Sequence, residues 1–267
     1  MTNQAKTLDA IDDALESEDY ERALVLASDA VREYPDDASL QAAYGDALWA
    51  LDDLEDATQA YRTALRLDPN EADSWGALAQ LQFQLGDFAA AREAALRCLD
   101  LEQSADALEV LSRVAERDAD LVRADEFATR ANALDPECVI PYRVTEEEFQ
   151  DLVRAALEDI PDRFRDALDS EVAILVEPVP ALDLLRSETP PLDPELLGLY
   201  VGTPLTERDA PVTGTALPDQ VFIFQRNLEH IADNRDELVE QIRITLFHEI
   251  GHHFGFSDED LEARDFG

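Results

Sequence analysis

Three of the four histidines in this 267-residue chain fall within six consecutive positions. Among them, His248, Glu249 and His252 form the pattern H-E-x-x-H in a segment whose apolar residues recur at helical spacing. Residues i and i+4 of an α-helix lie about 40° apart on one face, so both imidazoles can reach one metal ion. His253 lies about 140° around the helix from His248, which predicts a packing or supporting role. The alternative is a histidine pair packed beside the core.

A metal ion held by two histidines needs a third protein ligand. Gly255 allows the chain to turn back, and Asp258 follows three residues later, completing the string H-E-x-x-H-x-x-G-x-x-D. Three protein ligands and an open fourth position are typical of catalytic zinc, so we predict a Zn²⁺ cofactor with the ligands His248, His252 and Asp258. Glu249 is the predicted catalytic base, which takes a proton from water at the open position and passes it to a leaving amine. Asp258 has an alternative role, as the N-cap of a short helix in DEDLEAR.

The elements that must position these residues occupy the second half of the chain. Thr145 and Glu148 begin a predicted helix that ends at Pro161, and a second helix, from Arg235 to Gly255, carries the motif. Three apolar runs are predicted strands: Glu171–Val179, Leu196–Leu205 and a run that begins at Val221. A bound peptide is expected to add to an edge strand, either LLGLYVG or VFIFQ.

This half of the chain resembles metzincin-type zincins with an aspartate third ligand. It is most similar to a minimal bacterial family of metzincin-like metallopeptidases, over about residues 145 to 262. The strings that carry the resemblance are EFQDLVRAALEDIPDRF, LLGLYVGTPLTER and QIRITLFHEIGHHFG with the trailing Asp258. The resemblance implies a small α+β domain and zinc-dependent peptide-bond hydrolysis. One departure is that Met1 is the only methionine, so no Met-turn can lie beneath the zinc.

The first half of the chain is an internal repeat. Pro35 and Pro69 are 34 residues apart, and each closes an alanine-rich amphipathic stretch. Small residues recur in the same phase, at Ala23, Ala57, Ala91 and Ala124 and again at Ala30, Ala64, Cys98 and Ala131. Small side chains let the two helices of a hairpin approach closely, and proline ends the second helix, so the pattern predicts stacked helical hairpins.

Over about residues 5 to 137 this repeat resembles the tetratricopeptide repeat (TPR). Trp75 and Leu78 match its early positions, Gly45 its glycine, and Tyr61 its later aromatic residue. The resemblance implies a concave groove that binds a protein or peptide partner. A rigid spacer and a self-association surface are the alternatives.

The charge of the chain excludes whole classes of partner. There are 61 acidic and 21 basic residues, a formal net charge of -40, so neither a nucleic acid nor an anionic membrane is an expected ligand. No apolar run approaches the roughly 18 residues of a membrane span, and the first residues lack a signal-peptide pattern. We therefore expect a cytoplasmic protein. Cys98 and Cys138 are expected to be buried, reduced thiols.

Together these patterns predict an α-helical, TPR-like solenoid over residues 1–140 and a small α+β zincin-like domain over residues 141–267. The expected function is that of a zinc metallopeptidase with a TPR-like region that recruits a protein substrate or regulator. The alternative is a TPR adaptor whose zincin domain binds metal without significant proteolysis. The intact Glu249 favours the enzyme, and the missing Met-turn favours the adaptor.

The acidic residues are scattered through both halves rather than gathered in a tail, which indicates adaptation to a salt-rich, halophilic cytoplasm. Because carboxylates repel one another at low ionic strength, we expect the melting temperature to rise as KCl increases from about 0.1 M to molar concentrations. Calorimetry across a KCl series measures this. A melting temperature that is highest in dilute buffer would contradict the halophilic interpretation.

Overall fold

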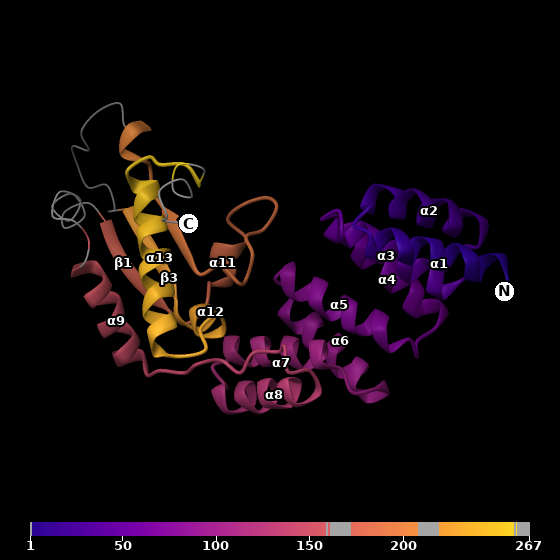
Figure 1. Ribbon diagram of the computed structural model, residues 1–267, viewed down its shortest axis with the longest axis horizontal. Helices are drawn as coiled ribbons and strands as arrows, with labels where there is room; N and C mark the ends of the chain where they lie inside the picture. The colour runs from indigo at the N-terminus through magenta and orange to yellow at the C-terminus, as the bar shows by residue number, and fades with distance from the viewer. Residues whose placement is uncertain (1, 159, 161–171, 208–218, 259, 261–267) are drawn as a thin grey trace. The chain divides into compact units, whose positions relative to one another are not determined.

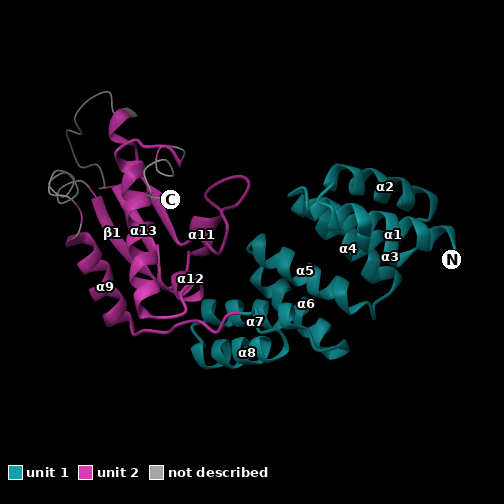
Figure 2. Ribbon diagram, in the orientation of Figure 1, with its two compact units in different colours: residues 1–138 teal, residues 139–267 magenta. Residues whose placement is uncertain are grey.

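The computed structural model describes residues 2–158, 160, 172–207, 219–258 and 260 (Figure 1). Two compact units make up the chain, as Figure 2 shows in two colours. We call Met1–Cys138 the helical unit and Val139–Gly267 the sheet unit. Within the described ranges, no helix combines the length and the apolarity that crossing a bilayer requires.

The helical unit is a series of helix pairs, seen at the right of Figure 1. In chain order its helices are α1 (Asn3–Glu16), α2 (Tyr20–Glu33), α3 (Ala38–Trp49), α4 (Leu54–Leu67), α5 (Ala72–Gln84), α6 (Phe88–Leu101), α7 (Ala105–Arg117) and α8 (Leu121–Leu134). The small residues that recur with the repeat are all at most 4% exposed: Ala23, Ala57, Ala91, Ala124, Ala30, Ala64, Cys98 and Ala131. The predicted helical solenoid is therefore confirmed, and Cys98 and Cys138 are buried free thiols as expected.

The turns inside the helix pairs follow the same period. Each contains one residue with a left-handed backbone, with φ between 59° and 71°: Glu18, Asp52, Gly86 and Ala119. In the last three pairs the next residue is an aspartate that accepts a backbone N–H of the following helix: Asp53, Asp87 and Asp120. Turn and cap thus stop one helix and start the next at a fixed place in each repeat.

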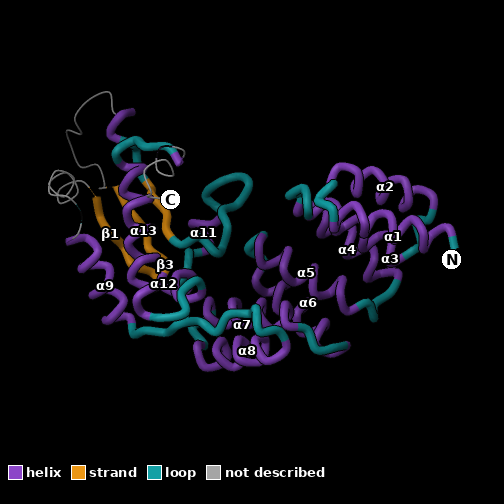
Figure 3. The backbone as a smooth tube through the Cα atoms, viewed as in Figure 1, coloured by secondary structure: helices purple, strands orange, loops and turns teal. Residues whose placement is uncertain are grey.

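The sheet unit combines a small sheet with helices (Figure 3). Its described elements are α9 (Glu146–Glu158), β1 (Val172–Glu177), α11 (Leu182–Leu185), β2 (Gly198–Val201), the 3₁₀ turn η1 (Leu205–Glu207), β3 (Asp219–Phe224), α12 (Gln225–His230) and α13 (Arg235–His253). The described strands form a three-stranded sheet in the order β1-β3-β2. β1 pairs with β3 in parallel, and β2 pairs with β3 antiparallel.

One face of this sheet is packed against α9 and α13. The core that they share contains fully buried side chains from all three elements: Phe149 of α9, Val221 and Ile223 of β3, and Leu238 and Ile242 of α13. Burial of such apolar side chains contributes about 1.5–3 kcal/mol each. The α+β architecture expected for this half is confirmed, and its core is what fixes α13 on the sheet.

Some predicted boundaries are corrected by the structure. The strand predicted over Leu196–Leu205 extends only from Gly198 to Val201, because Gly202 and Pro204 follow and proline cannot donate to a strand ladder. The motif helix ends at His253 rather than Gly255. The cap of α9 is confirmed, since the Thr145 hydroxyl accepts the Glu148 N–H at 3.2 Å. Pro161 and Glu171 lie outside the described residues.

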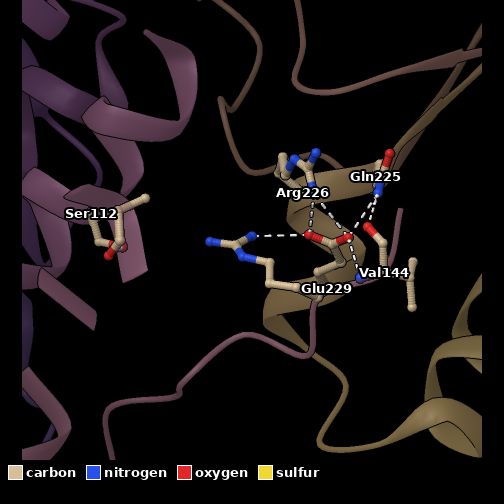
Figure 4. A network of polar contacts seen from close by, with 7 residues as sticks. Ser112, Val144, Gln225, Arg226 and Glu229 are labelled. Atoms are coloured by element: carbon tan, nitrogen blue, oxygen red, sulfur yellow. Dashed lines mark hydrogen bonds and ion pairs between the residues drawn. The ribbon is translucent and has the colours of Figure 1, made fainter. Parts of the chain in front are cut away.

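A fully buried carboxylate, Glu229 of α12, holds the segment that leads into α9. It accepts hydrogen bonds from Arg143 at 2.9 Å and from Arg226 at 2.7 Å, which also form ion pairs with it. Gln225 and the Val144 backbone N–H donate to its other oxygen at 2.8 and 3.2 Å, and Figure 4 shows these groups converging. The network joins residues about 85 positions apart in the chain, and no local sequence pattern predicts it.

We expect Glu229→Gln to lower the free energy of unfolding by about 3 kcal/mol, because two arginines only 18% and 12% exposed lose their compensating charge. Urea denaturation at fixed KCl measures this. The control is Glu240→Gln, which breaks an exposed ion pair with Arg243 and should cost under about 1 kcal/mol. Equal effects of the two substitutions would show that the buried network is not a stability determinant.

Candidate metal centre

Helix α13 is positioned by its cap and by one buried stripe. The Asn234 side chain accepts hydrogen bonds from the N–H groups of Asp236 and Glu237 at 3.0 and 3.1 Å. The carboxylates of these two residues also interact favourably with the partial positive charge at the N-terminus of the helix. A stripe of apolar residues one turn apart then faces the core, with at most 4% exposure: Leu238, Ile242, Leu246 and Ile250. The stripe sets the rotation of α13 about its axis and so decides where the motif residues point.

The side chains of His248, His252 and Asp258 come together at the C-terminal end of this helix. The Oδ1 atom of Asp258 lies 3.2 Å from Nε2 of His248 and 3.4 Å from Nε2 of His252, and one atom from each residue falls within 4.8 Å of the others. Two ligands 2.0–2.1 Å from a tetrahedral ion are separated by about 3.3 Å. The carboxylate–imidazole separations therefore match two edges of a zinc tetrahedron.

A tight reversal after α13 brings Asp258 back toward the histidines. Gly255 has φ +82°, and the Phe256 N–H bonds the Gly251 carbonyl at 3.1 Å. This is the glycine that the sequence places after the helix, here needed for its left-handed backbone. Nδ1 of His252 lies 3.2 Å from the Phe256 carbonyl. Because a carbonyl only accepts, Nδ1 carries a proton, and in the neutral ring this leaves Nε2, the atom nearest Asp258, with the lone pair that a metal ligand needs.

The alternative role of Asp258 as a helix N-cap is wrong, because Ser257 holds that position. The Ser257 hydroxyl accepts the Asp260 N–H at 3.3 Å, while Asp260 Oδ2 accepts the Ser257 N–H at 3.2 Å and its hydroxyl at 3.0 Å. This is a reciprocal capping box. It leaves the Asp258 carboxylate, with 74% of its side chain exposed, available to the two histidines.

Glu249 lies beside the histidines but in a different environment. It is 9% exposed and lines a cavity of about 570 Å³ between β2, α13 and the turn after α13. Burial raises the pKa of Glu249 to about 7; a hydrogen bond from the Tyr200 backbone N–H opposes this rise, and the charge of Asp258 adds to it. Gly198 makes the approach of α13 to β2 possible, since a Cβ there would lie 2.8 Å from Glu249 Cγ.

His253 has the supporting position predicted for it. Its side chain is fully buried, and its Nδ1 lies 2.9 Å from Oδ2 of Asp219, the first residue of β3. The Tyr200 hydroxyl donates to the same oxygen at 2.7 Å. Sequence reasoning missed Asp219, because a polar residue at the start of a strand carries no signal of its own. His230, a lone histidine without a predicted role, is buried in α12.

Comparisons with known proteins agree with both halves of this description. A family model described as zincin-like metallopeptidase matches residues 170–267. A tetratricopeptide-repeat model matches residues 14–81 and 48–103. The chain therefore joins tetratricopeptide repeats to a zincin-like domain. No curated protein matches it.

The chain is also similar to several solved structures. A thermophilic TPR protein of Thermus thermophilus is 18% identical, with 51% of this chain and 76% of that chain covered at a TM-score of 0.46. For Pseudomonas aeruginosa PilF the values are 20%, 50%, 62% and 0.45. For MamA (residues 41 to the end) of Desulfovibrio magneticus they are 19%, 63%, 91% and 0.45.

We expect Gly255→Ala to weaken zinc binding by at least tenfold, because it strains the turn that returns Asp258. Alanine at position 255 would have to adopt φ +82°, which L-residues rarely do. Its Cβ would also lie 2.1 Å from the Thr206 hydroxyl oxygen. Chelator competition measures the dissociation constant. The control is Gly76→Ala in α5, where a Cβ meets only Cys98 Sγ at an ordinary 3.6 Å. Unchanged zinc affinity in Gly255→Ala would remove the turn from the determinants of the site.

Proposed function

We propose that residues 141–267 form a zinc-dependent metallopeptidase domain and that residues 1–140 bind a protein substrate or regulator. The observation that carries the proposal is the convergence of two imidazole nitrogens and one carboxylate oxygen beside a buried glutamate. His₂-carboxylate sets with an open position are those of catalytic zinc, and the family match over residues 170–267 supports the same interpretation.

The donor set fits Zn²⁺. His248 and His252 would supply neutral imidazole nitrogens and Asp258 an ionised oxygen, and the two carboxylate–imidazole separations are compatible with a tetrahedral ion. The Phe256 carbonyl holds the His252 ring in the tautomer that a ligand needs. Zinc bound here would supply Lewis acidity and a water molecule of lowered pKa.

Glu249 is the proposed proton carrier. One helical position from His248, it points aside from the ligand pair and into the cavity, where its carboxylate is anchored by the Tyr200 N–H. Such a carboxylate can accept a proton from water and deliver it to the leaving amine of a cleaved peptide. The anchor limits the rotation of the side chain, which keeps the acceptor oxygen directed at the reacting water.

β2 is the proposed binding edge for an extended peptide. It pairs with β3 on one side only, whereas β3 is the central strand of the described sheet, which excludes VFIFQ as an edge. The Leu197 carbonyl accepts the Phe224 N–H at 2.9 Å, so by antiparallel alternation Gly198, Tyr200 and Gly202 direct their backbone groups away from β3. The amide and carbonyl groups of Gly198 and Gly202 can bind a substrate strand along the cavity that contains Glu249, while the Tyr200 N–H holds the Glu249 carboxylate.

The decisive experiment compares wild type with Glu249→Gln in high KCl, using zinc analysis and a peptide-library cleavage assay. We expect one zinc per chain in both proteins and a loss of cleavage of at least about 10²-fold in the variant, because Gln keeps the shape but cannot take a proton. Asp258→Ala is the companion control, which should lose zinc. Stoichiometric zinc without Glu249-dependent cleavage would instead favour the adaptor, a TPR protein whose zincin domain only holds metal.

A further inference from the structure

A second cluster of polar side chains lies behind the candidate metal ligands. The Asp219 carboxylate, on the first residue of β3, accepts the Tyr200 hydroxyl at 2.7 Å and lies 2.9 Å from Nδ1 of His253. The acid–base pair is largely enclosed: the Asp219 side chain is 13% exposed and His253 is fully buried. Gly202 closes over the cluster, since a Cβ there would lie 2.4 Å from Asp219 Cγ and 2.6 Å from the Tyr200 hydroxyl.

The cluster holds the last turn of α13 from both sides of His252. Tyr200 bonds the helix twice: directly, through its backbone N–H and the Glu249 carboxylate, and indirectly, through its hydroxyl, Asp219 and His253. His252 lies between these two attachment points in the sequence. The rotation and tilt of the last turn, and with them the direction of the His252 ring, are therefore tied to β2 and β3.

The chemistry of His253 makes the attachment specific. Because a carboxylate only accepts, Nδ1 of His253 carries the proton that points to Asp219. Its Nε2 is buried with no hydrogen-bond partner among the described residues. A buried imidazole of this kind has one strong polar contact, so its orientation depends on Asp219 rather than on a balance of several bonds.

We propose that Asp219 is a positioning residue for the metal centre, acting through His253 to set the place of His252 and, through Tyr200, that of Glu249. The inference rests on the proposed function only in that the ion is zinc. The contact of Asp219 with His253 reaches His252 through the backbone of α13, and its bond to Tyr200 reaches Glu249 through the Tyr200 backbone N–H. Residues that orient metal ligands from behind typically change metal affinity or activity by about 10–100-fold when removed.

The test measures zinc affinity by chelator competition and the absorption spectrum of the Co²⁺-substituted protein, whose visible bands report ligand geometry. We expect Asp219→Ala to raise the zinc dissociation constant by about 10–100-fold and to change the Co²⁺ spectrum. Asp219→Asn keeps an acceptor oxygen for both donors and should recover most of the loss. The matched control is Glu177→Gln, an exposed acidic residue at the end of β1, which should behave as wild type.

An unchanged dissociation constant and Co²⁺ spectrum in folded Asp219→Ala would overturn the proposal. If that variant does not fold, Tyr200→Phe replaces it, because it removes only the hydroxyl that holds Asp219 and keeps the ring and the backbone N–H. A raised dissociation constant with an altered Co²⁺ spectrum supports the positioning role, and wild-type values for both overturn it.

The measurement also separates this inference from the proposed function. Zinc affinity and the Co²⁺ spectrum can be measured without any peptide cleavage. The positioning role of Asp219 can therefore be tested even if the protein has no peptidase activity. If wild type binds no zinc, the proposed function fails and the ring ¹⁵N resonances of His252 in the metal-free protein become the readout. A shift of those resonances in Asp219→Ala or Tyr200→Phe, but not in Glu177→Gln, supports the positioning role, and unshifted resonances overturn it.

Discussion

The site depends on the packing of one helix stripe against the sheet. If Ile250 marks the direction of the core, the 100° step per residue places Leu246 about 40° and Ile242 about 80° from it on one side. His253 falls at about 60° on that same side, inside the stripe, and it is fully buried. His248 and His252 fall about 160° from Ile250, on opposite sides of the far face, where they remain 27–28% exposed. The rotation of α13 about its axis therefore places the candidate ligands on the exposed face and His253 on the buried face.

Helical geometry alone cannot complete a three-ligand site, because a single helix face offers only two suitably spaced imidazoles. In this chain the third candidate ligand comes from a segment that turns back within a few residues, and that turn uses the left-handed backbone of Gly255. The segment that follows the turn must also be held in place so that the Asp258 side chain points toward the histidines. The Ser257–Asp260 capping box does this, since it uses two side chains that flank Asp258 and leaves the carboxylate of Asp258 unused.

The parts of this structure that follow from the sequence are those whose cause is local. The repeat period, the C-terminal glycine of the motif helix and the pairing of i and i+4 histidines each depend on residues within one or two turns. Asp219 and Glu229 were not predicted, because their partners lie 34 and about 85 positions away and meet only after the strands and helices have packed. The strand predicted to Leu205 is too long because its apolar run continues past Gly202 and Pro204, which end the strand.

The acidity of the chain acts differently on the surface and in the interior. The exposed arginine–aspartate pairs one helical turn apart, such as Arg32 with Asp29, lie in solvent, where molar salt screens attraction and repulsion alike. Glu229 is fully buried between two largely buried arginines, so added salt reaches it little. The salt dependence of stability that we predict would therefore arise from repulsion among the surplus surface carboxylates rather than from the ion pairs. The candidate metal centre spans both regimes, because Asp258 is exposed while its support at Asp219 and His253 is enclosed. Salt can thus alter the charge that a cation meets at Asp258 without altering the geometry that holds His252.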